Sequence, residues 1–122
     1  MGRESYELGK NGEELACKYL LQKGFVIIER NFRAQQGEID IIAKEKDCMV
    51  FVEVKSYSYR SFYPPIYAIT KDKKGSIIRA AKYYVYKKKL YHELSRFDLV
   101  AIYQKPNGEM VFEHIKNAFG IN

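Results

Sequence analysis

The stretch GEIDIIAKEKDCMVFVEVK at residues 37–55 decides the fold, because it holds two apolar runs joined by a short polar turn. Both runs are rich in β-branched residues, which favours two strands paired as a hairpin. Three charged residues, Asp40, Glu53 and Lys55, nevertheless stand among the apolar ones. Charges in a strand core usually pair with each other, bind a metal or lie at the mouth of a cleft. The stretch therefore predicts a role for these three side chains.

The register of the hairpin brings the charges together. Side chains alternate along a strand, so Glu53 and Lys55 share one face of the second strand. A four-residue turn at residues 45–48 would set Asp40 directly opposite Glu53. Strict alternation in the first strand predicts one face with Glu38, Asp40 and Ile42, and an opposite face with Ile39, Ile41 and Ala43.

Two facing carboxylates repel each other unless a cation or a raised pKa relieves them. Mg²⁺ takes oxygen ligands, usually one or two carboxylates plus waters and substrate phosphate oxygens. Asp40 and Glu53 would supply such ligands, and Lys55 could orient or deprotonate a water for attack on phosphorus. The alternative is an ion pair of Lys55 with Glu53 or Asp40 on a solvated sheet face. Spacing alone leaves both interpretations open.

The rest of the chain extends the hairpin to a layered α/β fold. Apolar periodicity predicts helices over residues 4–23 and 76–91. Strands are predicted over residues 25–31, 38–44, 49–55, 96–103 and 110–115, with a loop over 56–74. Asn107-Gly108 is a strong hairpin turn between the last two strands. The order αβββαββ and the length predict a single domain, 1–122, with one sheet flanked by helices.

The first helix offers a further acidic group. At 100° per residue, Glu13 lies at the edge of the apolar stripe from Leu8 to Leu20, whereas Glu14 points into solvent. Glu13 would then reach inward toward the carboxylates. The alternative is a border glutamate whose carboxylate extends to water.

The charge balance favours an anionic partner. Lys and Arg total 21 against 15 Asp and Glu, which gives a formal charge of +6. Two basic segments, residues 71–75 and 86–91, are either solvated faces or, because tyrosines stand beside the second, a surface for bases and phosphates.

Several other classes of protein are excluded by missing patterns. No Gly-rich phosphate loop occurs, and His92 and His114 lack the spacing of a zinc site, so both are expected to be ordinary histidines. Cys17 and Cys48 are expected to be small core residues of a reducing cytosol. The chain has neither a signal peptide pattern nor an 18-residue apolar run, so we expect a soluble cytoplasmic protein without membrane contact.

Five short motifs spread over nearly the whole chain resemble one protein family. They are Gly12-Glu13 with Ala16, Gly37-Glu38-Ile39-Asp40, Phe51-Val52-Glu53-Val54-Lys55, Arg96-Phe97-Asp98 and Asn117-Ala118-Phe119. The pattern resembles the YraN-type family of uncharacterised bacterial proteins, which are predicted to be endonucleases. That family is similar to the PD-(D/E)XK nuclease superfamily and to archaeal Holliday junction resolvases. The resemblance implies a restriction-endonuclease-like fold with Glu13, Asp40, Glu53 and Lys55 as its site.

Two further family features differ in how well this chain matches them. The family tends to have a lysine before its second helix, and Lys73 matches it. An arginine is also expected shortly after the Glu-x-Lys motif, where this chain has Tyr57, and the nearest arginine is Arg60. The motif at residues 96–98 is expected to form a structural ion pair, and no chemical role is assigned to it or to residues 117–119.

The patterns together predict a nuclease that hydrolyses DNA phosphodiesters with Mg²⁺ or Mn²⁺, branched DNA being one candidate substrate. Asp40 and Glu53 are expected to hold the metal, with Glu13 aiding directly or through water, and Lys55 to position the nucleophile. The candidate phosphate contacts are Arg30, Arg33, Lys73, Lys74, Arg79 and Lys82. The resolvase resemblance implies a homodimer, because two symmetric cuts need two sites. A non-catalytic nucleic-acid-binding module and a structural adaptor, whose carboxylates pair with lysines, stay open as alternatives.

Overall fold

The computed structural model describes the backbone of residues 2–57 and 69–120 and the side chains of residues 11–57 and 69–120. Its elements are α1 (Gly2–Gln22), β1 (Val26–Ala34), β2 (Gly37–Glu45), β3 (Cys48–Tyr57), α2 (Lys71–Lys88), β4 (Leu94–Gln104) and β5 (Met110–Phe119). The strands form one sheet in the order β1-β2-β3-β4-β5, in which β3 and β4 are parallel and the other neighbours antiparallel. This mixed sheet with helices confirms the predicted layered α/β fold and its element order αβββαββ.

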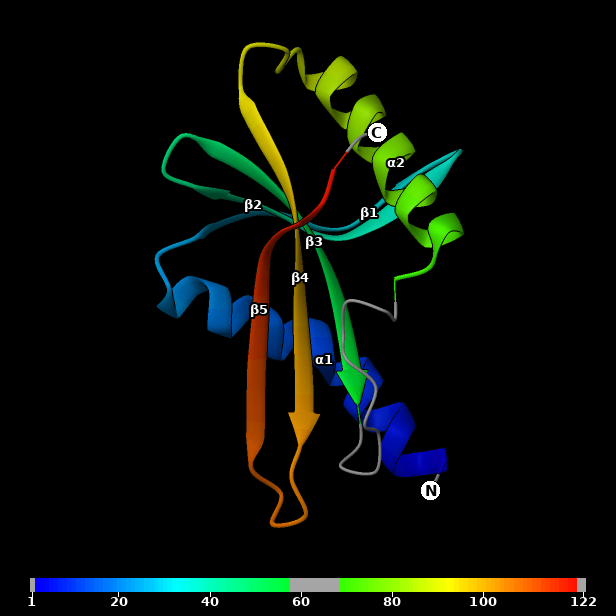
Figure 1. Ribbon diagram of the computed structural model, residues 1–122, viewed down its shortest axis with the longest axis vertical. Coiled ribbons are helices and arrows are strands. Elements are labelled where there is room, and N and C mark those ends of the chain that lie inside the picture. The colour runs from blue at the N-terminus through cyan, green and yellow to red at the C-terminus, as the bar shows by residue number, and fades with distance from the viewer. Residues whose placement is uncertain (1, 58–68, 121–122) are drawn as a thin grey trace.

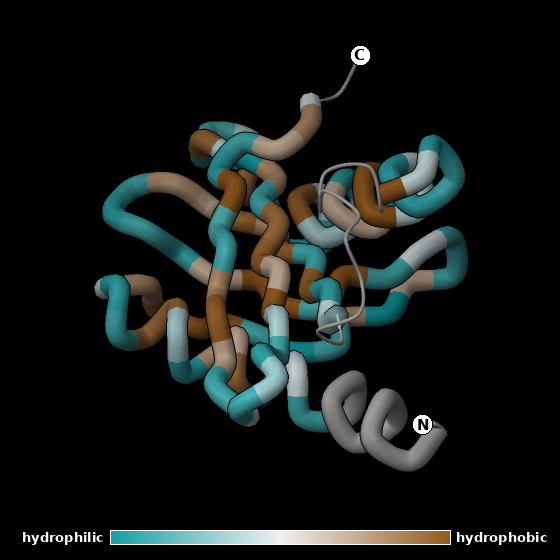
Figure 2. Tube along the Cα trace, turned by 60° about the horizontal axis from the view of Figure 1, so that its bottom comes forward, coloured by the Kyte–Doolittle hydropathy of each residue, from teal (hydrophilic) through white to brown (hydrophobic). Residues whose placement is uncertain are grey.

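The two helices cover the sheet with separate apolar clusters (Figure 1). The helix α1 packs Ala16, Cys17 and Leu20 against inner residues of β2, β3 and β4. The helix α2 packs Ile77, Ala81 and Tyr84 against a second set that includes Phe51 and Phe97. Hydrophobic segments of the chain accordingly gather along the strands at the centre of the molecule, while the outer turns are mostly hydrophilic (Figure 2).

Strict alternation is wrong for β2. Ile39 and Ile42 both belong to the cluster under α2, whereas Ile41 belongs to the cluster under α1. In the neighbouring strand β1, Asn31 lies opposite this point with a φ of 52°, a left-handed conformation that interrupts the regular alternation of β1. Phe32 pairs with Ile39 on one side of this point. The face on which β2 presents its side chains therefore changes at Asp40.

The second helix begins five residues earlier than the periodicity predicted, at Lys71. Thr70 caps the helix, because its hydroxyl accepts a hydrogen bond from the amide of Lys73 at 3.1 Å, and Asp72 adds favourable negative charge in the first turn. The predicted loop over 56–74 is therefore shorter, and its central part, residues 58–68 with Arg60, lies outside the described residues. The early start of α2 is what brings Lys73 toward the sheet.

The predicted turn at Asn107-Gly108 is confirmed. Gly108 has a φ of 88° and donates its amide to the carbonyl of Lys105 at 2.9 Å. Glycine suits this position because it adopts positive φ without a steric penalty. The turn joins β4 to β5, which extends to Phe119 and so includes residues 117–119.

Candidate active site

The Asp40 carboxylate lies where the β2–β3 ladder ends. The last pair in the register is Ile41 with Val52, so Asp40 and Glu53 occupy the next positions along the two strands. Oδ2 of Asp40 accepts a hydrogen bond from the amide of Val54 at 2.8 Å, in the place where a strand carbonyl would accept it. The structure thus brings the Asp40 and Glu53 carboxyl groups together at the end of the hairpin.

Glu53 is strongly affected by its surroundings, since the residue is only 6% exposed. Burial raises the pKa of Glu53, and the Asp40 carboxylate raises it further, both by accepting a hydrogen bond and by repelling negative charge. Lys73 lowers the pKa of Glu53 by a smaller amount, and the resulting value is about 9. Without a metal, Glu53 therefore keeps its proton at neutral pH and shares it with Asp40.

Glu13 reaches the same centre from α1. Burial and the Asp40 charge raise the pKa of Glu13, while Arg30 and a hydrogen bond with Asn31 lower it by less. One of its carboxyl oxygens, Oε1, is buried and has no hydrogen-bond partner among the described residues. A buried carboxyl oxygen without a partner is costly, which makes it a ready ligand for a cation or a bound water.

The close approach of α1 to β3 is what allows Glu13 to point inward. A Cβ atom at Gly12 would overlap the hydroxyl of Ser56, so a larger residue would require that side chain to move for the helix to lie this near the strand. On the outer side of the helix, Glu14 forms an exposed ion pair with Arg30 at 2.8 Å. The helix therefore presents Glu13 toward the carboxylates and Glu14 toward solvent.

Lys73 joins the acidic centre, although the sequence assigned it only to phosphate contacts. Its Nζ lies 3.4 Å from Oε2 of Glu53 and 3.5 Å from Oε1 of Glu38. Burial alone would lower the pKa of Lys73, but Glu53, Asp40 and Glu38 raise it overall. The start of α2 at Thr70 was the missed signal, because threonine followed by Asp72 is a typical helix N-terminus.

Lys55 lies on β3 two residues after Glu53. It is exposed, and no ion pair joins it to a carboxylate within residues 11–57 and 69–120. Its predicted ion pair with Glu53 or Asp40 is therefore wrong, since the cation on Glu53 is Lys73. The role of Lys55 in positioning the nucleophile stays a prediction.

The other predicted phosphate contacts are scattered over the β1–β2 end of the molecule and α2. Arg33 lies 3.8 Å from Glu38 in an exposed ion pair, and Arg79 donates to the Gln36 carbonyl at 3.1 Å. Lys74 lies over the Phe119 ring, and Lys82 is exposed on α2. Ion pairs between exposed side chains are weak, so the contact with Glu38 leaves the positive charge of Arg33 available to an anion.

The donor atoms of this centre suit a hard divalent cation. No group of three His, Cys, Asp or Glu side chains in the described part of the chain lies close enough to hold a metal ion. Mg²⁺, however, is commonly held by one or two carboxylates, with water and substrate oxygens completing its shell. The Asp40–Glu53 pair fits the one or two carboxylates of that ligand set, and Glu13 does not group closely enough with them to complete a site of three carboxylates.

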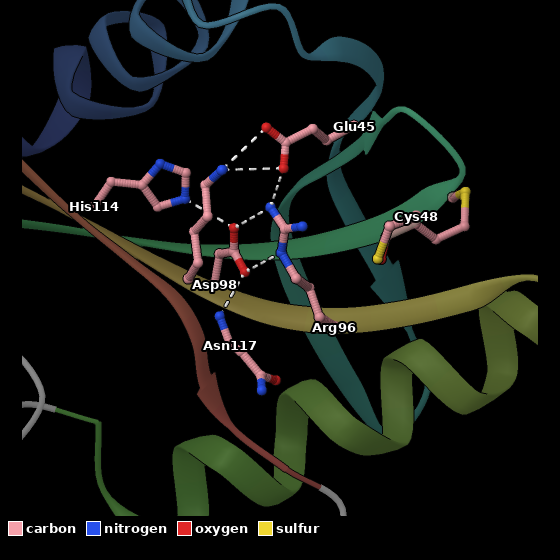
Figure 3. A network of polar contacts seen from close by, with 8 residues as sticks. Glu45, Cys48, Arg96, Asp98, His114 and Asn117 are labelled. Atoms are coloured by element: carbon pink, nitrogen blue, oxygen red, sulfur yellow. Dashed lines mark hydrogen bonds and ion pairs between the residues drawn. The ribbon is translucent and has the colours of Figure 1, made fainter.

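A second polar network surrounds the fully buried Asp98 (Figure 3). Its carboxylate accepts hydrogen bonds from Arg96 Nε at 2.9 Å, His114 Nε2 at 2.8 Å and the Asn117 amide at 3.0 Å. Burial would raise the pKa of Asp98, but His114, Arg96 and Asn117 lower it overall. Arg96 also binds Glu45 at 2.7 Å. The expected structural ion pair at residues 96–98 is confirmed, and His114 is an ordinary, satisfied histidine.

The fold and the Asp40–Glu53 centre define a small mixed α/β protein with a carboxylate pair at the end of the β2–β3 hairpin. A model of the uncharacterised protein family UPF0102 matches residues 12–102, and the chain belongs to that family. The UPF0102 protein of Dictyoglomus turgidum is 39% identical over 114 residues, which cover 93% of this chain and 97% of that protein. The UPF0102 protein of Clostridium perfringens strain ATCC 13124 is 38% identical over 122 residues, which cover 99% of this chain and 100% of that protein. The resemblance to the YraN-type family is thereby confirmed.

Among solved structures, SfsA of Pyrococcus furiosus in complex with Ca²⁺ is similar at 20% sequence identity and a TM-score of 0.39. The match covers 96% of this chain and 65% of that chain. None of the helices in the described residues is long and apolar enough to cross a membrane.

Proposed function

We propose that this protein is a divalent-metal-dependent nuclease that hydrolyses phosphodiester bonds of DNA. The observation that carries the proposal is the carboxyl pair of the half-buried Asp40 and the buried Glu53, with Glu13 directed toward it from α1. Burial and the neighbouring Asp40 carboxylate raise the pKa of Glu53, which weakens the fold at neutral pH and favours a compensating role for the pair. Holding a metal ion against a phosphate group is such a role.

Asp40 and Glu53 would hold the ion, with Glu13 binding it directly or through water. A bound Mg²⁺ or Mn²⁺ would supply a Lewis acid for the charge that develops at phosphorus. Lys73 lies 3.4 Å from Glu53 and keeps this carboxyl oriented, and it offers a positive charge for the phosphate. The exposed Lys55 is free to orient the attacking water, as the resemblance implies.

DNA is the proposed substrate because the chain carries a formal charge of +6. Binding should weaken steeply with salt, since phosphate contacts release counterions. Branched DNA and a homodimer stay predictions that rest on the resemblance.

A non-catalytic nucleic-acid-binding module is the second candidate. The contacts of Lys73 with Glu53 and Glu38 favour it, because an internal cation already neutralises part of the acidic centre. Ion-paired carboxylates of this kind occur in purely structural networks.

A cleavage assay separates the two candidates. Labelled duplex, single-stranded, flap and four-way DNA would be incubated with Mg²⁺, Mn²⁺ or EDTA, and products resolved on denaturing gels. We expect metal-dependent products from the wild type, none from Asp40→Asn, and wild-type amounts from Glu14→Gln, whose side chain binds Arg30 on the outer face of α1. Salt-sensitive DNA binding without any product would support the module, and products that survive Asp40→Asn would remove this centre from the reaction.

A further inference from the structure

A groove of about 340 Å³ lies between the β1–β2 turn and α2, apart from the carboxylate centre. Figures 1 and 2 both place this turn beside α2, and the Arg79 hydrogen bond to the Gln36 carbonyl joins them. The walls are formed by Phe32, Arg33, Ala34 and the two glutamines of the turn on one side, and by Tyr83 and Lys87 on the other. The volume is in the range of sites for small molecules or single groups of a polymer.

The floor of the groove is aromatic. Phe32 is buried, and its ring stacks on Tyr83 with centroids 6.4 Å apart and an interplanar angle of 25°. Tyr83 is 46% exposed, so part of this ring meets solvent. A flat ring that is fixed by a buried neighbour and open on its outer side is suited to stacking on a planar group.

The rim of the groove is positively charged. Arg33 and Lys87 line it, and none of the lining residues in the described part of the chain is acidic. Arg33 has an ion pair with Glu38 at 3.8 Å, but its side chain is 77% exposed, so this contact is weak and leaves the guanidinium available to an anion. The amides of Gln35 and Gln36 add hydrogen-bond donors and acceptors. These groups match the parts of a nucleotide. The planar ring suits the face of the base, the two cations suit the phosphates, and the two amides suit the hydrogen-bonding edge of the base.

A chain of contacts connects the groove to the carboxylates. Arg33 contacts Glu38, Glu38 contacts Lys73 at 3.5 Å, and Lys73 contacts Glu53 at 3.4 Å. A strand bound in the groove would therefore lie within a few side chains of the proposed metal centre. An acidic peptide would also pair with the two cations, but its carboxylate side chains have no planar ring that could stack on Tyr83.

We propose that this groove binds an unpaired nucleotide of single-stranded DNA, with its base stacked on Tyr83 and its phosphates held by Arg33 and Lys87. The inference rests on the proposed function and specifies its substrate as DNA with an unpaired segment. A base inside a duplex cannot reach the ring, because both of its faces are already stacked on neighbouring bases.

The test measures binding without cleavage. Fluorescence anisotropy would follow a short labelled oligothymidylate, and a duplex of equal length, binding to the full chain in EDTA. Tyr83→Leu keeps apolar bulk but removes the flat ring, so it should weaken single-strand binding by roughly fivefold or more and change duplex binding by less than about twofold. Tyr83→Phe should bind as the wild type does. The matched control is Tyr86→Leu, which alters a neighbouring exposed tyrosine of α2 outside the groove and should have no effect.

Thermal melts of each variant would verify folding, and the Tyr83→Phe and Tyr83→Leu pair separates stacking from simple packing. Equal single-strand affinity of Tyr83→Leu and Tyr86→Leu would overturn the inference, as would absence of single-strand binding by the wild type. Preference of the groove for a labelled polyglutamate peptide over the oligothymidylate would overturn it as well. Single-strand binding through Tyr83 without metal-dependent cleavage would leave the groove assignment standing and refute the nuclease. Metal-dependent cleavage, with single-strand binding that Tyr83→Leu does not weaken, would support the nuclease and refute the groove assignment.

Discussion

Replacing Glu53 by glutamine should stabilise the metal-free protein at neutral pH. The pKa of Glu53 is about 9, well above its ordinary value of 4.5. As the pH rises above 4.5, the unfolded chain loses this proton and the folded protein keeps it, so stability falls by about 1.4 kcal/mol per pH unit and stops falling above about pH 9. The accumulated loss is about 3 kcal/mol at pH 7, which is an upper value because Asp40 shares the proton. A glutamine amide is neutral and can donate to Asp40 as the protonated acid does.

The assay is urea unfolding of wild type and Glu53→Gln in EDTA at pH 5, 6, 7 and 8. The free-energy difference between the two proteins should be small near pH 5 and should grow in favour of the variant as the pH rises. Glu38→Gln is the matched control, because Glu38 contacts the same Lys73 from an exposed position and should change stability by less than about 1 kcal/mol at every pH. A difference in unfolding free energy between the two proteins that stays constant from pH 5 to pH 8 would refute the argument that Glu53 is protonated in the folded protein.

Three further substitutions test other parts of the structure. Lys73→Met should slow metal-dependent cleavage about tenfold or more in single-turnover assays, since it removes the cation on Glu53, whereas the exposed Lys71→Met of the same helical turn should not. Asp98→Asn should cost about 3–5 kcal/mol in urea unfolding at pH 7, because its buried partners lose their counterion. Since the pKa of Asp98 lies below its ordinary value, that stabilisation should be lost as the pH falls below about 4. Gly37→Ala should cost about 1–3 kcal/mol because a Cβ there collides with the Ser76 backbone, while Gly120→Ala, which meets no atom within 4 Å, should be neutral.

The parts of the fold that depend on local chemistry were predictable from sequence. The short turn before Cys48 fixes the β2–β3 register and sets Asp40 beside Glu53, and the Asn107-Gly108 turn fixes the β4–β5 hairpin. The inward direction of Glu13 also followed from helix periodicity, because it depends only on the angle between residues along α1.

The remaining features depend on contacts between distant segments. The face change of β2 lies opposite the left-handed Asn31 of the neighbouring strand, and hydrophobic alternation does not reveal it. Lys73 reaches Glu53 only because Thr70 starts α2 early and the helix packs back across β2. The Asp98 network joins residues from three strands, so the sequence indicated an ion pair at residues 96–98 but not the bond to His114. The groove beside Tyr83 likewise exists only after α2 has packed against the β1–β2 turn.

Binding of Mn²⁺ to the purified protein tests the central claim most directly. Isothermal titration at pH 8 should detect binding to the wild type, and both Asp40→Asn and Glu53→Gln should weaken it at least about tenfold, because each replaces a carboxylate ligand by a neutral amide. Glu14→Gln should bind as the wild type does, since its side chain contacts Arg30 on the outer face of α1. Lys73→Met should bind Mn²⁺ more tightly, because it removes the ammonium group that competes for Glu53. A wild type that binds no Mn²⁺, or Asp40 and Glu53 variants that bind it as tightly as the wild type, would contradict a metal centre at this carboxylate pair.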